Sequence, residues 1–285
     1  MRPAWWIKGR ISDIITGMSA KEDSPIRTNY HTHTTRCKHA QGSDESYVLS
    51  AIQGGFARLG FSEHIPWPYP DDFVSSSRMG MAELEGYVQS VNALKAAYAG
   101  RIQIYLGFEA EHFPEYLDWL LEIRERYPDA LLLFGNHYDS RREEVYYGKV
   151  SERRHVLRYA GQALAGIASG LYDCLAHPDL FMQAYPAFDD SCRSASRDIC
   201  QAARAMNLPL EYNVSGFYSA HRRRGGIGFP CLDFWRIAAR EGCSAVIGID
   251  AHTPERLLDA PLYDLARQHL KALGIPEFTR LLPDS

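Results

Sequence analysis

The chain has 285 residues, of which 46% are hydrophobic and 23% are charged, which suits one large α/β domain and leaves no apolar run of about 18 residues to span a membrane. The formal net charge of −4 gives no overall attraction to nucleic acid or to acidic membranes. The six cysteines form no C-x-x-C pair, which is typical of reduced thiols, and a cytoplasmic location is expected.

Residues 1–27 come before the organised pattern of the chain. This segment contains the apolar Trp5-Trp6-Ile7 but no continuous apolar core of the kind found in a signal peptide. We therefore expect residues 1–27 to form a poorly ordered extension outside the fold. A single domain is expected over residues 28–285.

From residue 28 onward, apolar runs alternate with segments in which apolar residues recur every three to four positions. The runs predict strands and the recurring pattern predicts helices. In chain order the expected elements are strand 29–33, helix 43–53, strand 58–64, helix 81–98, strand 102–109, helix 114–127, strand 130–137, helix 151–169, strand 173–177, helix 191–206, strand 208–213, helix 229–241, strand 245–252 and helix 254–273.

This alternation indicates parallel strands joined by right-handed helical crossovers. Most of the strands are almost continuously apolar, as in a sheet that is buried on both faces. Seven such units can close into a TIM-like barrel or stay open as a doubly wound sheet, and periodicity alone does not separate the two. The position of the polar residues favours the barrel, so we predict an α/β fold, a distorted (β/α)7 TIM-like barrel in a single domain.

The first strand carries two histidines, His31 and His33. At this spacing both side chains point to the same face of a strand, about 7 Å apart, so both imidazoles can reach one metal ion. Taken alone, the two residues could equally be a hydrogen-bonded pair at a polar strand end. Other metal-capable residues shift the balance, because they too lie at the ends of strands or in the first loop: His39, His64, Glu109, His137, His177, Asp250 and His252.

In an α/β barrel, the carboxyl ends of the strands carry the chemistry. A set of nine imidazoles and carboxylates gathered there is typical of a site for borderline divalent ions such as zinc, iron or manganese. A local excess of positive charge from such ions would attract a phosphate dianion to an otherwise acidic chain.

The motifs resemble the histidinol-phosphate phosphatases of the polymerase-and-histidinol-phosphatase superfamily. The similarity runs from about residue 28 to the C-terminus, and its motifs are His31-Thr32-His33, Cys37-Lys38-His39, Gly60-Phe61-Ser62-Glu63-His64, Gly107-Phe108-Glu109, Asn136-His137, Ala176-His177-Pro178-Asp179-Leu180, Asn213-Val214-Ser215-Gly216 and Gly248-Ile249-Asp250-Ala251-His252.

The resemblance implies two to three divalent metal ions (Zn, Fe or Mn) on nine ligands. It implies that one ion is held by His31, His33, Glu109 and Asp250, that Glu109 bridges to a second ion with His137 and His177, and that a third ion is held by His39, His64 and His252. The residues expected to take part in catalysis, as ligands that hold the nucleophilic water, are His31, His33, Glu109, Asp250 and His252.

The activity implied by the resemblance is hydrolysis of L-histidinol phosphate to L-histidinol and phosphate, a step of histidine biosynthesis. Metal ions lower the pKa of a bound water toward about 7, and the hydroxide attacks phosphorus in line with the leaving oxygen. We expect a small phosphorylated substrate, no membrane or nucleic-acid partner, and a monomer or homodimer.

Three further features have two interpretations each. Arg222, Arg223 and Arg224 form a basic run that is either a solvated loop or a clamp for the substrate phosphate. Glu111 could bind a substrate ammonium, although a simple ion pair is the preferred interpretation. Cys37 could bind a metal ion, although a packing role is preferred.

Two other functions remain open at this point. A related metal-dependent phosphatase or exonuclease, acting on nucleotides or nucleic-acid ends, would need a basic, aromatic-lined groove beyond the metal pocket. A catalytically silent metal-binding or partner-binding barrel would be expected to lack some of the ligands, and none of the nine is missing.

Overall fold

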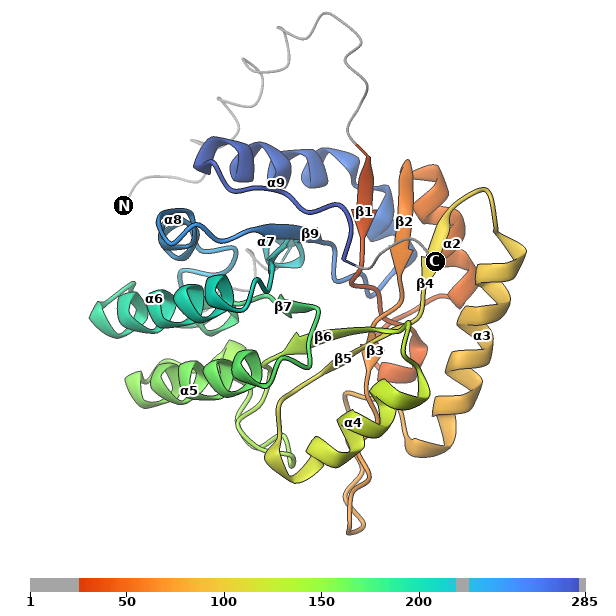
Figure 1. Cartoon of the computed structure of the whole chain (residues 1–285), viewed down its shortest axis with the longest axis horizontal. Helices are drawn as coiled ribbons and strands as arrows, with labels where there is room; N and C mark the ends of the chain where they lie inside the picture. Colours follow the sequence, from red (N-terminus) through yellow and green to blue (C-terminus); the bar gives the residue numbers. More distant parts are fainter. Residues whose placement is uncertain (1–25, 219–225, 282–285) are drawn as a thin grey trace, which may run out of the picture.

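A ring of short parallel strands forms the centre of the molecule (Figure 1). The structure is a computed structural model that describes residues 26–218 and 226–281. Two of the expected strands are each interrupted once, which gives nine strands: β1 (Arg27–Asn29), β2 (Phe56–Gly60), β3 (Glu63–His64), β4 (Gln103–Tyr105), β5 (Gly107–Ala110), β6 (Leu131–Gly135), β7 (Cys174–Ala176), β8 (Leu210–Asn213) and β9 (Ala245–Gly248).

Hydrogen bonding divides these strands into two parallel sheets, β1-β2-β4 and β3-β5-β6-β7-β8-β9. The sheets are continuous along the chain, because β3 follows β2 after two residues and β5 follows β4 after one. The residues after β1 close the ring: Thr32 bridges Ala251 in parallel, and the backbone N–H of His33 donates to the carbonyl of Ala251 at 2.9 Å. On the other side, the N–H of Ser62 donates to the carbonyl of Thr32 at 2.8 Å. The seven strand stretches thus form the distorted α/β barrel predicted from the sequence.

Helices surround the strands on the outside (Figure 1). Those that follow the predicted order are α2 (Asp44–Gln53), α3 (Leu84–Ala97), α4 (Leu117–Arg126), α5 (Arg153–Ser169), α6 (Asp190–Ala205), α8 (Leu232–Arg240) and α9 (Ala260–Leu273). Short 3-10 turns precede or join some of them: η2 (Thr35–Cys37), η3 (Met81–Glu83), η4 (Pro114–Tyr116), η5 (Tyr147–Lys149), η6 (Leu180–Met182) and η8 (Pro254–Leu258). Within the described residues, no helix is both long enough and apolar enough to cross a lipid bilayer.

The structure differs from the sequence-based expectation in the last helix. The expected helix 254–273 is two elements, η8 and α9, separated at Asp259. The Asp259 side chain accepts a hydrogen bond from the N–H of Leu262, and Pro261 lies in the first turn of α9. A side-chain cap and an early proline both favour the start of a new helix at this point. The four-residue helix α7 (Ser215–Tyr218) was not expected.

The first strand begins within the segment that was expected to lie outside the fold. Arg27 is the first residue of β1, and its guanidinium pairs with Asp264 of α9 at 2.7 Å. Farther along β1, the backbone of Thr28 exchanges hydrogen bonds with the hydroxyl of Tyr263. Residues 1–25 lie outside the described residues, so the extension itself stays a prediction.

Candidate metal centre

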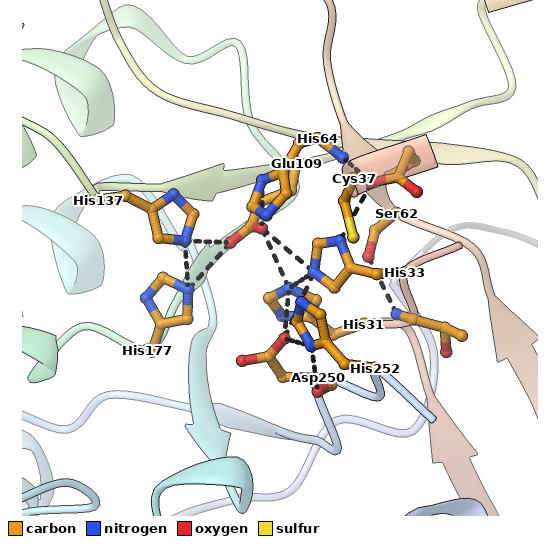
Figure 2. A network of polar contacts seen from close by, with 12 residues as sticks. His31, His33, Cys37, Ser62, His64, Glu109, His137, His177, Asp250 and His252 are labelled. Atoms are coloured by element: carbon orange, nitrogen blue, oxygen red, sulfur yellow. Dashed lines mark hydrogen bonds and ion pairs between the residues drawn. The ribbon is translucent and has the colours of Figure 1, made fainter. Parts of the chain in front are cut away.

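The candidate site lies at the carboxyl ends of the strands, where one cavity of about 1110 Å³ opens to solvent. Eight of the nine predicted ligands line this cavity, and the ninth, His31, is fully buried next to them. Figure 2 shows the cluster, with His137 and His177 on one side of Glu109 and His33, His252 and Asp250 on the other. The structure therefore brings together side chains that come from separate strands.

Six imidazoles are arranged as three pairs in which Nε2 faces Nε2. The distances between these nitrogens are 3.0 Å for His31 and His33, 3.1 Å for His137 and His177, and 2.9 Å for His39 and His252. A neutral imidazole has one N–H and one lone pair, so each pair is a hydrogen bond only if one of its two Nε2 atoms carries a proton.

The other ring nitrogen decides where that proton lies. Nδ1 of His39 faces the carbonyl of Cys37 at 2.7 Å, and Nδ1 of His252 faces the carbonyl of Asp250 at 3.1 Å. A carbonyl only accepts, which fixes the proton of each neutral ring on Nδ1 and leaves a lone pair on Nε2. Burial and the nearby His33 lower the pKa of His252 to about 4, and the same two causes lower that of His39. Both rings are therefore neutral at pH 7, and two lone pairs 2.9 Å apart repel each other unless a cation binds both.

Glu109, at the end of β5, lies between the two halves of the cluster. Its Oε1 is 2.9 Å from Nε2 of His177 and 3.2 Å from Nε2 of His137. Its Oε2 is 3.2 Å from Nδ1 of His64 and 3.3 Å from Nε2 of His31. Each oxygen thus faces a different group of imidazoles, which is the arrangement that a carboxylate bridging two ions requires (Figure 2).

Asp250 completes the group around the first two histidines. Its Oδ1 is 3.3 Å from Nε2 of His33, while its Oδ2 accepts hydrogen bonds from the Ser215 hydroxyl at 3.0 Å and from the Asn213 amide at 3.3 Å. Asp250 has a φ of 51° and His177 a φ of 29°. Non-glycine residues in this region cost about 1–3 kcal/mol each, and such strain collects at functional sites.

Behind the imidazoles lie three buried carboxylates that the sequence analysis did not assign to this role. Glu211 accepts from Nδ1 of His31 at 2.7 Å, Glu63 faces Nδ1 of His33 at 3.4 Å, and Glu111 faces Nδ1 of His137 at 3.1 Å. Carboxylates in this position fix the ring orientation of metal-binding histidines and make them better ligands. Glu211 could have been suspected, because it is the one charged residue of the expected strand 208–213.

Glu111 also pairs with Arg78, whose guanidinium is 2.9 Å away and almost completely buried. Burial opposes the charge of Glu111, but Arg78 and the hydrogen bond with His137 lower its pKa to about 2. The ion-pair interpretation of Glu111 is thus the one that the structure supports. Arg78 in turn bonds to Glu143, on the loop that borders the cavity, at 3.0 Å.

The buried carboxylates favour positive charge on the neighbouring imidazoles. Burial lowers the pKa of His33, but hydrogen bonds with Asp250 and Glu63 outweigh it and raise the value to about 9. Burial likewise opposes the charge of His137, and Glu109 raises its pKa to about 10. In the protein without bound ions this positive charge is supplied by protons, which a divalent ion would have to displace.

These observations fit a metal centre. Groups of three ligand atoms lie within 4.8 Å of one another around several points, among them His31, His33 and Glu109, and His31, His177 and Asp250. The donor set of imidazoles with two carboxylates suits zinc, iron or manganese. The assignment of individual ligands to individual ions stays a prediction.

Cys37 itself belongs to another such group, together with His39 and His252. Its sulfur is buried and accepts a hydrogen bond from the N–H of Ala40 at 3.2 Å. Burial, followed by the charge of Glu63, raises the pKa of the thiol to about 12. This favours the packing role, because the thiolate is the form that binds metals. The predicted phosphate clamp at Arg222, Arg223 and Arg224 lies outside the described residues and stays a prediction.

A barrel whose strand ends carry clustered imidazoles and carboxylates defines a class of metal-binding α/β proteins. The family model of the PHP domain matches residues 29–215, well over half of the chain. The chain therefore belongs to the PHP domain family, as the motifs indicated.

Individual relatives agree with this assignment. The chain is 26% identical over 236 residues to a probable histidinol-phosphatase of Deinococcus radiodurans, covering 79% of this chain and 85% of the relative. It is 23% identical over 274 residues to a probable histidinol-phosphatase of Schizosaccharomyces pombe, covering 86% of each. The crystal structure of a histidinol phosphate phosphatase from Lactococcus lactis, complexed with zinc, L-histidinol and phosphate, has a TM-score of 0.68 at 19% identity. That match covers 88% of this chain and 95% of the other, and it confirms the fold.

The first prediction concerns protons. Adding zinc to the chelated protein at pH 8 should release protons, because His33 and His137, with pKa values of about 9 and 10, are still protonated there. The affinity should also fall between pH 8 and pH 6, since protons compete more strongly at the lower pH. Isothermal titration calorimetry in two buffers of different ionisation enthalpy measures the released protons. Binding without proton release would contradict the proposed charge balance.

The second prediction concerns Glu211. Glu211→Gln should weaken zinc binding about 10- to 100-fold, because His31 loses the carboxylate that fixes its tautomer. Gly248→Ala should have a similar effect, since a Cβ at Gly248 would overlap Oε1 of Glu211 and displace that side chain. Zinc affinity measured by chelator competition is the readout. Glu122→Gln, on the exposed face of α4, is the matched control, and equal affinity in all four proteins would refute a supporting role for Glu211.

Proposed function

We propose that the protein is a metal-dependent phosphomonoesterase that hydrolyses L-histidinol phosphate to L-histidinol and phosphate. The observation that carries this proposal is the cluster of three facing imidazole pairs around Glu109 and Asp250. The family and its relatives support the particular reaction, because relatives along most of the chain bear the name histidinol-phosphatase.

In this proposal the chain acts chiefly by holding charged groups at fixed positions around the substrate phosphate. Divalent ions bound in the cluster would lower the pKa of water and offset the negative charge that develops on the phosphate oxygens. Glu109 would keep the two halves of the cluster at a fixed separation, since its two oxygens face different imidazoles. Glu63, Glu111 and Glu211 would hold the imidazole rings in orientation, so that little reorganisation is needed during the reaction.

The charge of the cavity rim supports a cationic leaving group. Glu144 and Glu152 line the cavity in addition to the two carboxylates of the cluster and to Glu143, which is paired with Arg78. Lys149 and Arg256 are the permanent cations among the described lining residues. L-Histidinol carries an ammonium group that such a rim attracts, while the repeated phosphates of a nucleic acid would be repelled. This balance favours histidinol phosphate over the nuclease alternative.

The solved Lactococcus lactis phosphatase was crystallised with L-histidinol and phosphate, the two products of the proposed reaction. All six cysteines are free and buried, which supports the proposal that the enzyme works in the reducing cytoplasm. We further propose that it acts on this small phosphorylated substrate without a nucleic-acid partner, as a monomer or homodimer.

The third prediction is the substrate preference. The metal-replete enzyme should release phosphate from L-histidinol phosphate at least about 100-fold faster, in kcat/KM, than from nucleoside monophosphates, because only the former has a cationic leaving group. Chelation should abolish the activity, and zinc or manganese should restore it. Phosphate release is measured with a colorimetric assay under identical conditions.

Glu109→Gln is the matched negative control for this assay. It keeps the shape of the side chain but removes the charge that faces both halves of the cluster, so at least about a 100-fold loss of kcat is expected. Equal or faster turnover of nucleotides by the wild-type enzyme would overturn the proposed substrate. Activity that survives complete removal of metal would overturn the proposed mechanism.

A further inference from the structure

Arg256 is a cation on the wall of the cavity that none of the roles above uses. It lies in η8, four residues after His252, and lines the same cavity as His252 and Asp250. The turn is well anchored, because the next residue, Leu257, is completely buried and η8 packs against α2. The side chain of Arg256 is itself only partly buried, so its position is fixed by the backbone while its charge remains accessible.

The guanidinium of Arg256 is stacked on an aromatic ring. Its Cζ lies 3.3 Å from the centre of the Tyr218 ring, and Tyr218 also lines the cavity. The Tyr218 hydroxyl donates a hydrogen bond to Oδ2 of Asp259 at 2.7 Å, which holds the ring in place from its far end. Arg256 also makes a side-chain hydrogen bond with Tyr218. A guanidinium has five N–H groups in a planar fork, so others at its edge can still donate to phosphate oxygens.

No carboxylate lies within ion-pair distance of Arg256 in the part of the chain that the structure describes. Glu255, the residue directly before Arg256 in the turn, is exposed to solvent. Asp259, three residues after Arg256, is occupied by Tyr218 and by the N–H of Leu262 at the start of α9. By contrast, the buried Arg78 is paired with both Glu111 and Glu143. An arginine with an unneutralised charge on a cavity wall is suited to an anionic ligand.

The two permanent cations of the described lining have different surroundings. Lys149 belongs to η5 and lies close in sequence to Glu144 and Glu152, which also line the cavity. Arg256 instead follows Asp250 and His252, two predicted ligands of the cluster. The cavity thus has a cation on the turn that follows two predicted ligands, and carboxylates on the loop that contains residues 143–152.

We propose that Arg256, seated on the Tyr218 ring, binds an oxygen of the substrate phosphate and orients the phosphate on the metal cluster, with the cationic leaving group toward Glu144 and Glu152. The inference rests on the proposed phosphomonoesterase function, which it deepens by naming a residue that recognises the phosphate. Arg256 binds the dianion in the substrate and in the product alike, so its effect is mainly on binding rather than on the chemical step.

The fourth prediction tests this role with Arg256→Ala. KM for L-histidinol phosphate and the inhibition constant of inorganic phosphate should both rise about 10- to 100-fold, as expected for loss of a charge-assisted contact to phosphate. The value of kcat should change much less, about threefold or under. For Arg256→Lys, both constants should lie between those of the wild type and Arg256→Ala, because lysine keeps the charge but loses the forked geometry. Added guanidinium should partly rescue Arg256→Ala and leave the wild type unchanged.

Arg236→Ala is the matched control, since Arg236 is an exposed arginine of α8 that pairs with Asp233. Zinc content is measured for every variant, and it should equal that of the wild type. If both constants stay within about twofold of the wild type in Arg256→Ala, the assignment is wrong. If they rise only together with a loss of zinc, Arg256 supports the metal site structurally and the assignment is also wrong.

The stacking of Arg256 on the Tyr218 ring is tested by a double-mutant cycle. Tyr218→Leu removes the aromatic face and should raise the phosphate inhibition constant about three- to tenfold, whereas Tyr218→Phe keeps the face and should raise it less. In the Arg256→Ala background, Tyr218→Leu should have no further effect, because the ring acts through the guanidinium. Additive effects of the two substitutions would contradict this arrangement.

The experiments also distinguish failure of the proposed function from failure of the Arg256 assignment. If the wild type does not hydrolyse L-histidinol phosphate, the substrate proposal falls, but calorimetric titration of inorganic phosphate into the zinc-loaded protein still reports on Arg256. Loss of phosphate binding in Arg256→Ala alone, and not in Arg236→Ala, would then uphold the phosphate site. Unchanged phosphate binding in both variants would overturn it.

Discussion

The repulsion between facing nitrogen lone pairs is the constraint on which the site depends. In the His39–His252 pair both rings are neutral and both have their proton held by a backbone carbonyl, so Nε2 can only offer an electron pair. In the other two pairs, buried carboxylates hold Nδ1 of His31 and His137, and protons on His33 and His137 supply the positive charge when no ion is bound. Such an arrangement is stable when positive charge, either protons or metal ions, lies among the nitrogens. The proposed phosphatase chemistry rests on this charge pattern, whereas membership of the PHP domain family rests on the match of the family model to residues 29–215.

The barrel supplies the geometry that this pattern needs. Parallel strands end at the same rim, so residues that are distant in sequence meet there without any special loop. The irregular steps of the barrel occur near the ligands: β2 is separated from β3 just before His64, and β4 from β5 just before Glu109. Glycine makes one further close approach possible, because any side chain at Gly135 would overlap Glu109. The regular part of the fold is thus built from apolar strands, and its departures from regularity lie next to the polar centre.

Much of this could be predicted from the sequence, because a barrel strand is an apolar run and its last residue is easy to recognise. The convergence of His64, Glu109 and His177 follows from the order of strands alone. The supporting acids could not be assigned, since Glu211 lies 180 residues from its partner His31 and no local pattern joins them. Arg78 lies in a loop, where no periodicity indicates that an arginine will be buried. The stacking of Arg256 on Tyr218 likewise depends on the break between η8 and α9 at Asp259. The helical periodicity of residues 254–273 gave no sign of this break.

Closure of the barrel brings the start and the end of the described fold to the same point. The first ligands follow β1 and the last follow β9, and His39 and His252, whose Nε2 atoms face each other, are 213 residues apart in the sequence. An ion held by this pair would act as a cross-link that closes a very long chain loop, and the free energy of binding it would add to that of folding. The cation that takes part in the chemistry would then also hold the first and last strands together. Removal of the cation would therefore impair catalysis and the stability of the barrel together.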